Sequence, residues 1–159
     1  MTAKKLWSSL KQVECTALSI NLKLTYRHDG EKGFDTMKLF LLDVVNNKTQ
    51  LVNCNGLDDY YKYIGCENID IVRRTIGGVP VNIICDDEAL LNATPKVSAI
   101  DVVGLPALFG NLLVAGGQVV DGELTELTTE EIKQIMFNTA LVTTSDYKNP
   151  YKIFVEIDY

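Results

Sequence analysis

The residues best suited to chemistry in this sequence are two adjacent arginines, Arg73 and Arg74, which precede a Gly77, Gly78 pair. A guanidinium can bind a phosphate or a carboxylate through two parallel hydrogen bonds. Both arginines fall in a run typical of a β-strand, where successive side chains point to opposite faces. Only one of them can therefore serve a given pocket. The alternative is that the pair is solvated or guards an exposed strand edge.

The densest group of charges is a run of three carboxylates, Asp86, Asp87 and Glu88. Carboxylates can ligate Mg²⁺ or act as general acid and base. Neighbouring side chains point in different directions, so a metal site would need a further carboxylate from elsewhere in the chain. The simpler interpretation is a helix cap, in which Asp86 or Asp87 accepts backbone N–H groups at the start of a turn over residues 89–91. We expect no cofactor.

Three more side chains are candidate ligand contacts, namely Tyr60, Tyr61 and Asn111. Tyrosines can stack on a base or cover a partner surface, although in a short helix they more often fill the core. Asn111 follows Gly110 inside an otherwise apolar stretch. A buried amide either binds a ligand or pairs with backbone groups in the core, and the sequence leaves both interpretations open.

The sequence lacks the signature motifs of several classes of enzyme. There is no P-loop, dinucleotide-binding glycine pattern, nucleophile elbow or zinc-protease motif. His28 is the only histidine, and its place in a predicted turn does not suit a Ser-His-Asp relay. The four cysteines form no C-x-x-C pair, so we expect free thiols in a reducing compartment.

Net charge and hydropathy narrow the classes of partner that this chain can bind. The formal net charge is −6, which argues against direct binding to a nucleic-acid backbone and is compatible with docking to a basic protein. No apolar run is long enough to cross a bilayer, and no apolar segment typical of a secretion signal follows the first lysines. We expect a cytoplasmic protein with no membrane partner.

Short strands and turns must position these residues. We predict an α+β fold, mainly antiparallel sheet with two or three short helices. One helix spans 55–65, with Asn55 as N-cap and Gly65 as its stop, and a second begins at a capping box made by Thr128 and Glu131. The predicted strands are 18–26, 37–45, 50–53, 69–76, 79–85, 97–103, 106–115 and 151–157. We predict a single domain, in which residues 1–36 add a strand element to a core over 37–159.

Five ordered segments carry a resemblance to a known family: residues 56–61, 64–66, 69–78, 83–91 and 109–112. Over about residues 37–115 the chain resembles a family catalogued as a domain of unknown function (number 3846), found in bacteria, phages and other mobile elements. The resemblance implies no established activity. It implies a setting in which small acidic proteins often act as accessory or counter-defence factors.

We therefore expect a non-enzymatic binding protein of phage or mobile-element origin, which sequesters a small nucleotide-like ligand derived from host defence. An acidic inhibitor of a host defence protein is the alternative, and a metal-dependent phosphodiesterase using the carboxylate run is a second alternative. We also expect a homo-oligomer in the host cytoplasm, because exposed short strands can pair across a two-fold axis.

Overall fold

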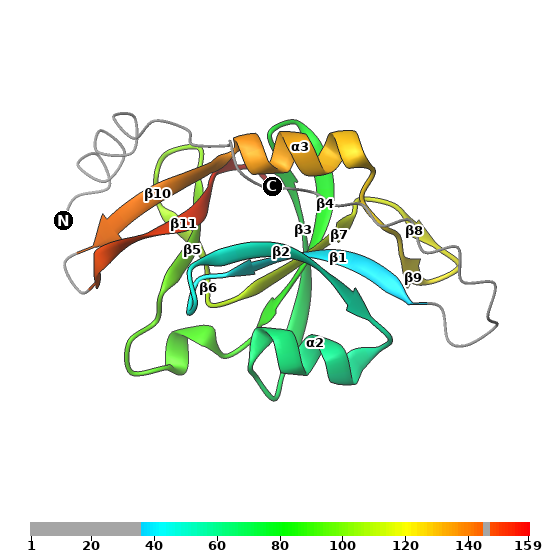
Figure 1. Cartoon of the computed structure of the whole chain (residues 1–159), viewed down its shortest axis with the longest axis horizontal. Coiled ribbons are helices and arrows are strands. Elements are labelled where there is room, and N and C mark those ends of the chain that lie inside the picture. Colours follow the sequence, from blue (N-terminus) through cyan, green and yellow to red (C-terminus); the bar gives the residue numbers. More distant parts are fainter. Residues whose placement is uncertain (1–35, 145–146) are drawn as a thin grey trace.

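The computed structural model describes residues 36–144 and 147–159, which build two packed β-sheets, a small hairpin and three helical segments (Figure 1). Sheet A is fully antiparallel, with the strand order β2-β1-β7-β4-β3. Its strands are β1 (Met37–Asp43), β2 (Lys48–Cys54), β3 (Ile69–Ile76), β4 (Val79–Asp86) and β7 (Leu112–Gly116). The strand expected at 18–26 and the turn around His28 lie outside the described residues.

Sheet B has the order β10-β11-β5-β6, and its β11–β5 pair is parallel. It consists of β5 (Val97–Asp101), β6 (Pro106–Phe109), β10 (Thr139–Thr144) and β11 (Tyr147–Ile157). A separate hairpin contains β8 (Val119–Val120) and β9 (Glu123–Leu124), and the helical segments are α2 (Leu57–Ile64), α3 (Thr129–Phe137) and the 3-10 turn η1 (Ala89–Leu91). The fold is thus α+β with strands dominating, and no helix in the described ranges is long and apolar enough to span a membrane.

Sheet A has an apolar core on each face, because its strands alternate between the two faces. On β1, Phe40 and Leu42 join the core that includes α3 and sheet B, whereas Leu39 and Leu41 join the core beneath α2. Figure 1 shows α2 and α3 on opposite sides of the sheet. Both faces of sheet A are therefore largely covered, and its edges become the places where backbone groups can meet a partner.

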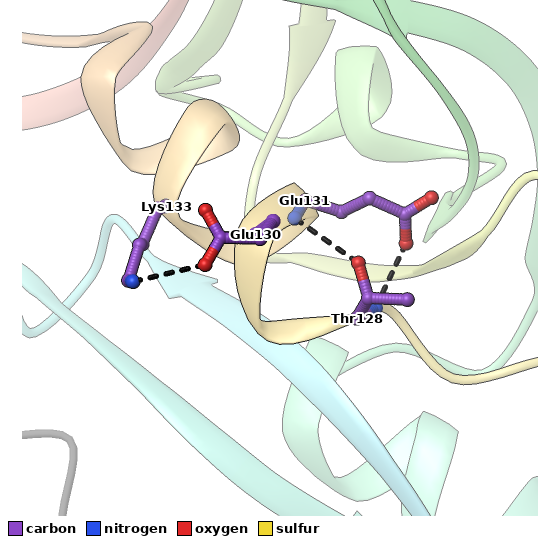
Figure 2. Close-up of polar contacts among 4 residues, drawn as sticks. All are labelled: Thr128, Glu130, Glu131 and Lys133. Atoms are coloured by element: carbon purple, nitrogen blue, oxygen red, sulfur yellow. Dashed lines mark hydrogen bonds and ion pairs between the residues drawn. The ribbon is translucent and has the colours of Figure 1, made fainter.

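Two local predictions are confirmed. Gly77 and Gly78 form the two-residue β3–β4 turn with φ angles of 58° and 81°, which favour glycine at both positions. The capping box of α3 is also present (Figure 2). The Glu131 N–H donates to Thr128 Oγ1 at 3.2 Å, and the Thr128 N–H donates to Glu131 Oε2 at 2.8 Å.

The predicted strand over 106–115 is wrong as a single element. It breaks at Gly110, whose φ is 77°, and at Asn111, so that β6 belongs to sheet B and β7 to sheet A. The apolar pattern continues through the break because both sheets bury their strands in the same interior. A continuous hydrophobic run therefore does not distinguish one long strand from two that cross between layers.

Several turns and caps differ in detail from those predicted. The β1–β2 turn occupies 44–47, earlier than expected, and β10 was not predicted at all. Asn55 does not cap α2, since Gly56 occupies the N-cap position without a side-chain bond. Asp59 instead accepts the Asn55 N–H at 2.7 Å from inside the first turn. The predicted stop at Gly65 is confirmed by its left-handed backbone, with φ of 78°.

The Gly77, Gly78 turn generates a test of the packing between the β3–β4 hairpin and α3. A methyl group at Gly77 would meet the Asn138 side chain, whereas one at Gly78 would meet nothing within 4 Å. Both changes impose a left-handed conformation that costs roughly 1–2 kcal/mol. Only Gly77→Ala also displaces the Asn138 amide from its hydrogen bond to the Gln134 carbonyl, a further cost of about 0.5–1.5 kcal/mol. Urea unfolding should therefore show a larger stability loss for Gly77→Ala than for Gly78→Ala; equal losses would refute the predicted contact.

Candidate functional site: the edge strand of sheet A

Arg73 and Arg74 lie on β3, the last strand of sheet A, and face opposite sides of the sheet as predicted. Arg74 shares its face with Val72 and Ile76, which contact the core between the sheets. Its guanidinium lies over the Tyr159 ring, with Cζ 4.3 Å from the ring centroid, and its Nη1 donates to the Arg73 carbonyl at 2.7 Å. Arg74 is therefore held in place at the strand edge.

Arg73 has a different environment. It is exposed, and within the described ranges its guanidinium makes no hydrogen bond and no ion pair. Ile71, two residues earlier on the same face, is 45% exposed. Arg73 is thus the arginine of the pair that is available to an anionic group, while Arg74 matches the edge-guarding alternative.

The edge of β3 is only partly covered. Thr75 exchanges two backbone hydrogen bonds with Asp158, at 2.7 and 2.9 Å, where the chain continues from β11. Closer to the start of the strand, side chains of β3 itself form hydrogen bonds with two backbone groups of the edge. Asp70 Oδ1 accepts the Ile71 N–H at 2.8 Å, and Arg74 meets the Arg73 carbonyl. In the part of the chain that the structure describes, no strand pairs with this edge between Ile69 and Arg73.

The two candidate tyrosines lie on α2, which covers the same face of sheet A that carries Arg73. Tyr60 is half-buried and packs against the core beneath α2, together with Tyr63. Burial raises the pKa of Tyr60 above its usual value, and Cys54 nearby adds to this effect. Tyr61 is also half-buried but does not belong to that core. Of the two candidates, Tyr61 is therefore better placed for stacking on a ligand.

Asn111 is buried, and both ends of its amide bond to backbone groups. Its Oδ1 accepts the N–H groups of Val44 and Val45, at 3.0 and 3.4 Å, and its Nδ2 donates to the Tyr63 carbonyl at 3.2 Å. The side chain thus links the β1–β2 turn to α2 at the crossover between the sheets. This geometry favours pairing within the core over contact with a ligand.

The carboxylate run leaves β4 as a turn. Asp86 Oδ1 accepts the Glu88 N–H at 2.9 Å, while Glu88 is the N-cap residue of η1 and makes no side-chain cap bond. Neither Asp86 nor Asp87 is therefore the predicted N-cap of the 89–91 turn; Asp86 instead closes a turn around Asp87 that precedes it. Among the described residues, no three metal-ligating side chains come together. Leu90 and Leu91, which follow directly, are 65% and 80% exposed.

The three described cysteines, Cys54, Cys66 and Cys85, are free thiols, and Cys15 lies outside the described residues. Burial, assisted by Asp70, raises the pKa of Cys85 to about 11. Burial, assisted by Asp59, does the same for Cys54. These thiols are poor nucleophiles because the reactive thiolate form is suppressed at neutral pH.

Sequence reasoning missed Asp70 and Tyr159 as members of this site. Asp70 carried a usable signal, since it is a carboxylate at the beginning of a strand that ends in two arginines. Tyr159 carried none, because its position over Arg74 depends on the long-range pairing of Thr75 with Asp158.

Comparison with known protein families gives one match. The model described as Domain of unknown function (DUF3846) matches residues 37–140, from the start of β1 to the start of β10. The match contains all of sheet A, including the edge strand β3, together with α2 and α3. Comparisons with curated proteins and with solved structures find no match.

The Asn111 geometry generates a stability prediction. Asn111→Ala leaves the N–H of the fully buried Val44 without an acceptor, which costs about 1–3 kcal/mol in addition to the other lost bonds. We expect a loss of at least about 2 kcal/mol in chemical unfolding. Asn92→Ala, at an exposed position, should change stability by no more than about 0.5 kcal/mol. Similar stability for the two variants would contradict the structural role of Asn111.

Proposed function

The chain belongs to the family of domain of unknown function 3846, and we propose that it is a non-enzymatic binding protein of a phage or mobile element, in which Arg73 receives an anionic, nucleotide-like ligand derived from host defence. The observation that supports this proposal is the exposed Arg73 guanidinium, which has no bonded partner within the described ranges. An arginine without a partner can offer both of its paired donors to a phosphate.

The surroundings of Arg73 add further support. The exposed Ile71 provides apolar surface on the same face of the sheet, and α2 with its half-buried Tyr61 covers that face. An apolar side chain next to a cation, with an aromatic side chain on the same face of the sheet, suits a ligand that combines a planar base with a phosphate. The proposed origin in a phage or mobile element, and the proposed role in counter-defence, rest on analogy with the setting in which such families occur.

Isothermal titration calorimetry with ATP, cyclic AMP and cyclic di-AMP tests this function. We expect wild-type protein to bind at least one of them, and Arg73→Ala to weaken binding roughly 10- to 100-fold, as expected when a charged hydrogen bond is lost. Lys48→Ala removes the same charge from an exposed position on β2 and should leave affinity unchanged. The proposal fails if wild-type protein binds none of the three, or if Arg73→Ala binds as wild type does.

A second function, inhibition of a host protein through an acidic surface, is favoured by the corner where β4 ends. Asp70 on β3 lies opposite Cys85 on β4, and Asp86 and Asp87 follow Cys85 in the chain, while Arg74 adds a positive charge to the same corner. The exposed Leu90 and Leu91 follow immediately. Carboxylates beside exposed apolar side chains are a combination suited to docking a basic protein surface.

Affinity capture from host cells tests this second function. A retained protein should dissociate when NaCl is raised from about 50 mM to about 500 mM, because salt screens exposed charges. The Leu90→Ser, Leu91→Ser variant should lose the protein. Val119→Ser, Val120→Ser is the matched control, since these valines are also more than half exposed but lie on the β8–β9 hairpin. Equal capture by both variants would exclude the corner where β4 ends, with Leu90 and Leu91, as the docking surface.

A further inference from the structure

We propose that the β3 edge from Ile69 to Arg73 is an interaction surface for a second copy of this chain, whose own β3 pairs antiparallel with it across a two-fold axis at Ile71. The proposal concerns assembly and does not depend on the ligand proposed for Arg73.

The backbone groups of alternate residues on β3 point away from β4. The N–H and the C=O of Thr75 both bond to Asp158, so Thr75 faces outward. Residues two apart on a strand orient their backbone groups the same way, hence Ile69, Ile71 and Arg73 also face outward. The Asp70 bond to the Ile71 N–H and the Arg74 bond to the Arg73 carbonyl agree with this direction. These are the groups that a further strand would pair with.

Charge along this edge is self-complementary. Asp70 lies at the beginning of the strand and Glu67 two residues before it, whereas Arg73 and Arg74 lie toward its end. An antiparallel copy places its acidic end beside the basic end of the first, and does so twice because of the two-fold symmetry. A second copy of the chain is therefore a partner whose charge fits without any further assumption.

The backbone direction and Tyr159 together select the register. Only residues that face outward can exchange hydrogen bonds, so pairing Ile71 with its own copy also pairs Ile69 with Arg73 on either side. A register shifted toward the end of the strand, with Ile71 opposite Arg73, would place Asp70 of the second copy where Tyr159 lies beside Arg74. With Ile71 on the axis, the residue opposite Arg74 is Asn68, which precedes β3, so pairing between the two strands stops at Arg73 and only this flanking residue must turn away from Tyr159.

This register also gives new partners to Asp70 and Arg74, whose side chains bond to backbone groups of the β3 edge in the single chain. Asp70 of one copy becomes the diagonal neighbour of Arg74 in the other, a separation of about 7–8 Å between Cα atoms that long side chains can span. Asp70 and Arg74 leave the Ile71 N–H and the Arg73 carbonyl to the second strand and can form an ion pair with each other. The exposed Ile71 side chains meet at the axis and bury apolar surface.

Analytical ultracentrifugation of the full chain between about 5 and 500 μM tests the surface, since a five-residue strand pair belongs to the weak interface class. We expect a reversible wild-type dimer, and a monomer for Ile71→Lys, which places like charges opposite each other at the axis. Leu57→Lys, at an exposed apolar position on α2, should dimerise as wild type does. A wild-type monomer at every concentration, or a dimer that Ile71→Lys does not weaken, overturns the proposal.

Charge reversal tests the register. Asp70→Arg and Arg74→Glu should each weaken the dimer at least tenfold, because each places like charges on diagonal neighbours. An equimolar mixture of the two variants should form a heterodimer, since opposite charges then meet again. Circular dichroism confirms that each variant is folded. A mixture of two folded variants that shows no more dimer than either variant alone overturns the proposed register.

Discussion

The arrangement of the molecule depends on one buried amide, the side chain of Asn111. It lies where the chain leaves sheet B at Gly110 and enters sheet A, and a buried amide of this kind must be hydrogen-bonded. Its three bonds reach the β1–β2 turn and the end of α2. A single polar side chain thereby sets the position of a turn and a helix relative to β7, the central strand of sheet A.

The β1–β2 turn is also tied to sheet B through Asn47. Its Nδ2 donates to the Pro150 carbonyl at 3.0 Å, and its Oδ1 accepts the Lys152 N–H at 3.1 Å. Within the turn, Asp43 accepts both the N–H and the side-chain amide of Asn46. These bonds fix the turn that leads into β2. Because the apolar cores cover both faces of sheet A, a partner can reach the backbone of that sheet at its edge strands, β2 and β3, and β3 is the one that carries Asp70, Arg73 and Arg74.

Sequence reasoning located most elements of this fold but not their connections. The β3–β4 hairpin and the α3 capping box were predictable, since glycine conformation and capping chemistry are local. The opposite directions of Arg73 and Arg74 followed from strand geometry alone. The crossover at Gly110 was missed, because apolar residues continue through it and the two sheets share an interior. Asn111 was recognised as unusual, but its partners Val44 and Tyr63 are distant in sequence and no local pattern identifies them.

The candidate site, like the fold, could be predicted where it depends on local sequence but not where it depends on long-range contacts. Arg73 could be identified from its residue type and from the strand, and the structure adds that it is the arginine without a bonded partner in the described ranges. The role of Arg74 depends on Tyr159, which reaches it only because Thr75 pairs with Asp158 at the far end of the chain. The charge separation along β3 was visible in the sequence. Only the structure shows that β3 is an edge strand, where this charge pattern can contact a partner.

Hydrogen exchange of the β3 amides tests the central claim that this edge, which no described strand covers between Ile69 and Arg73, is able to receive a partner. Val72 and Arg74, which face β4, should exchange slowly at all protein concentrations. Ile71 and Arg73 should exchange rapidly in dilute solution and become protected as concentration rises. Protection of Ile71 and Arg73 at every dilution would show that the edge is already covered within one chain, and would contradict this account.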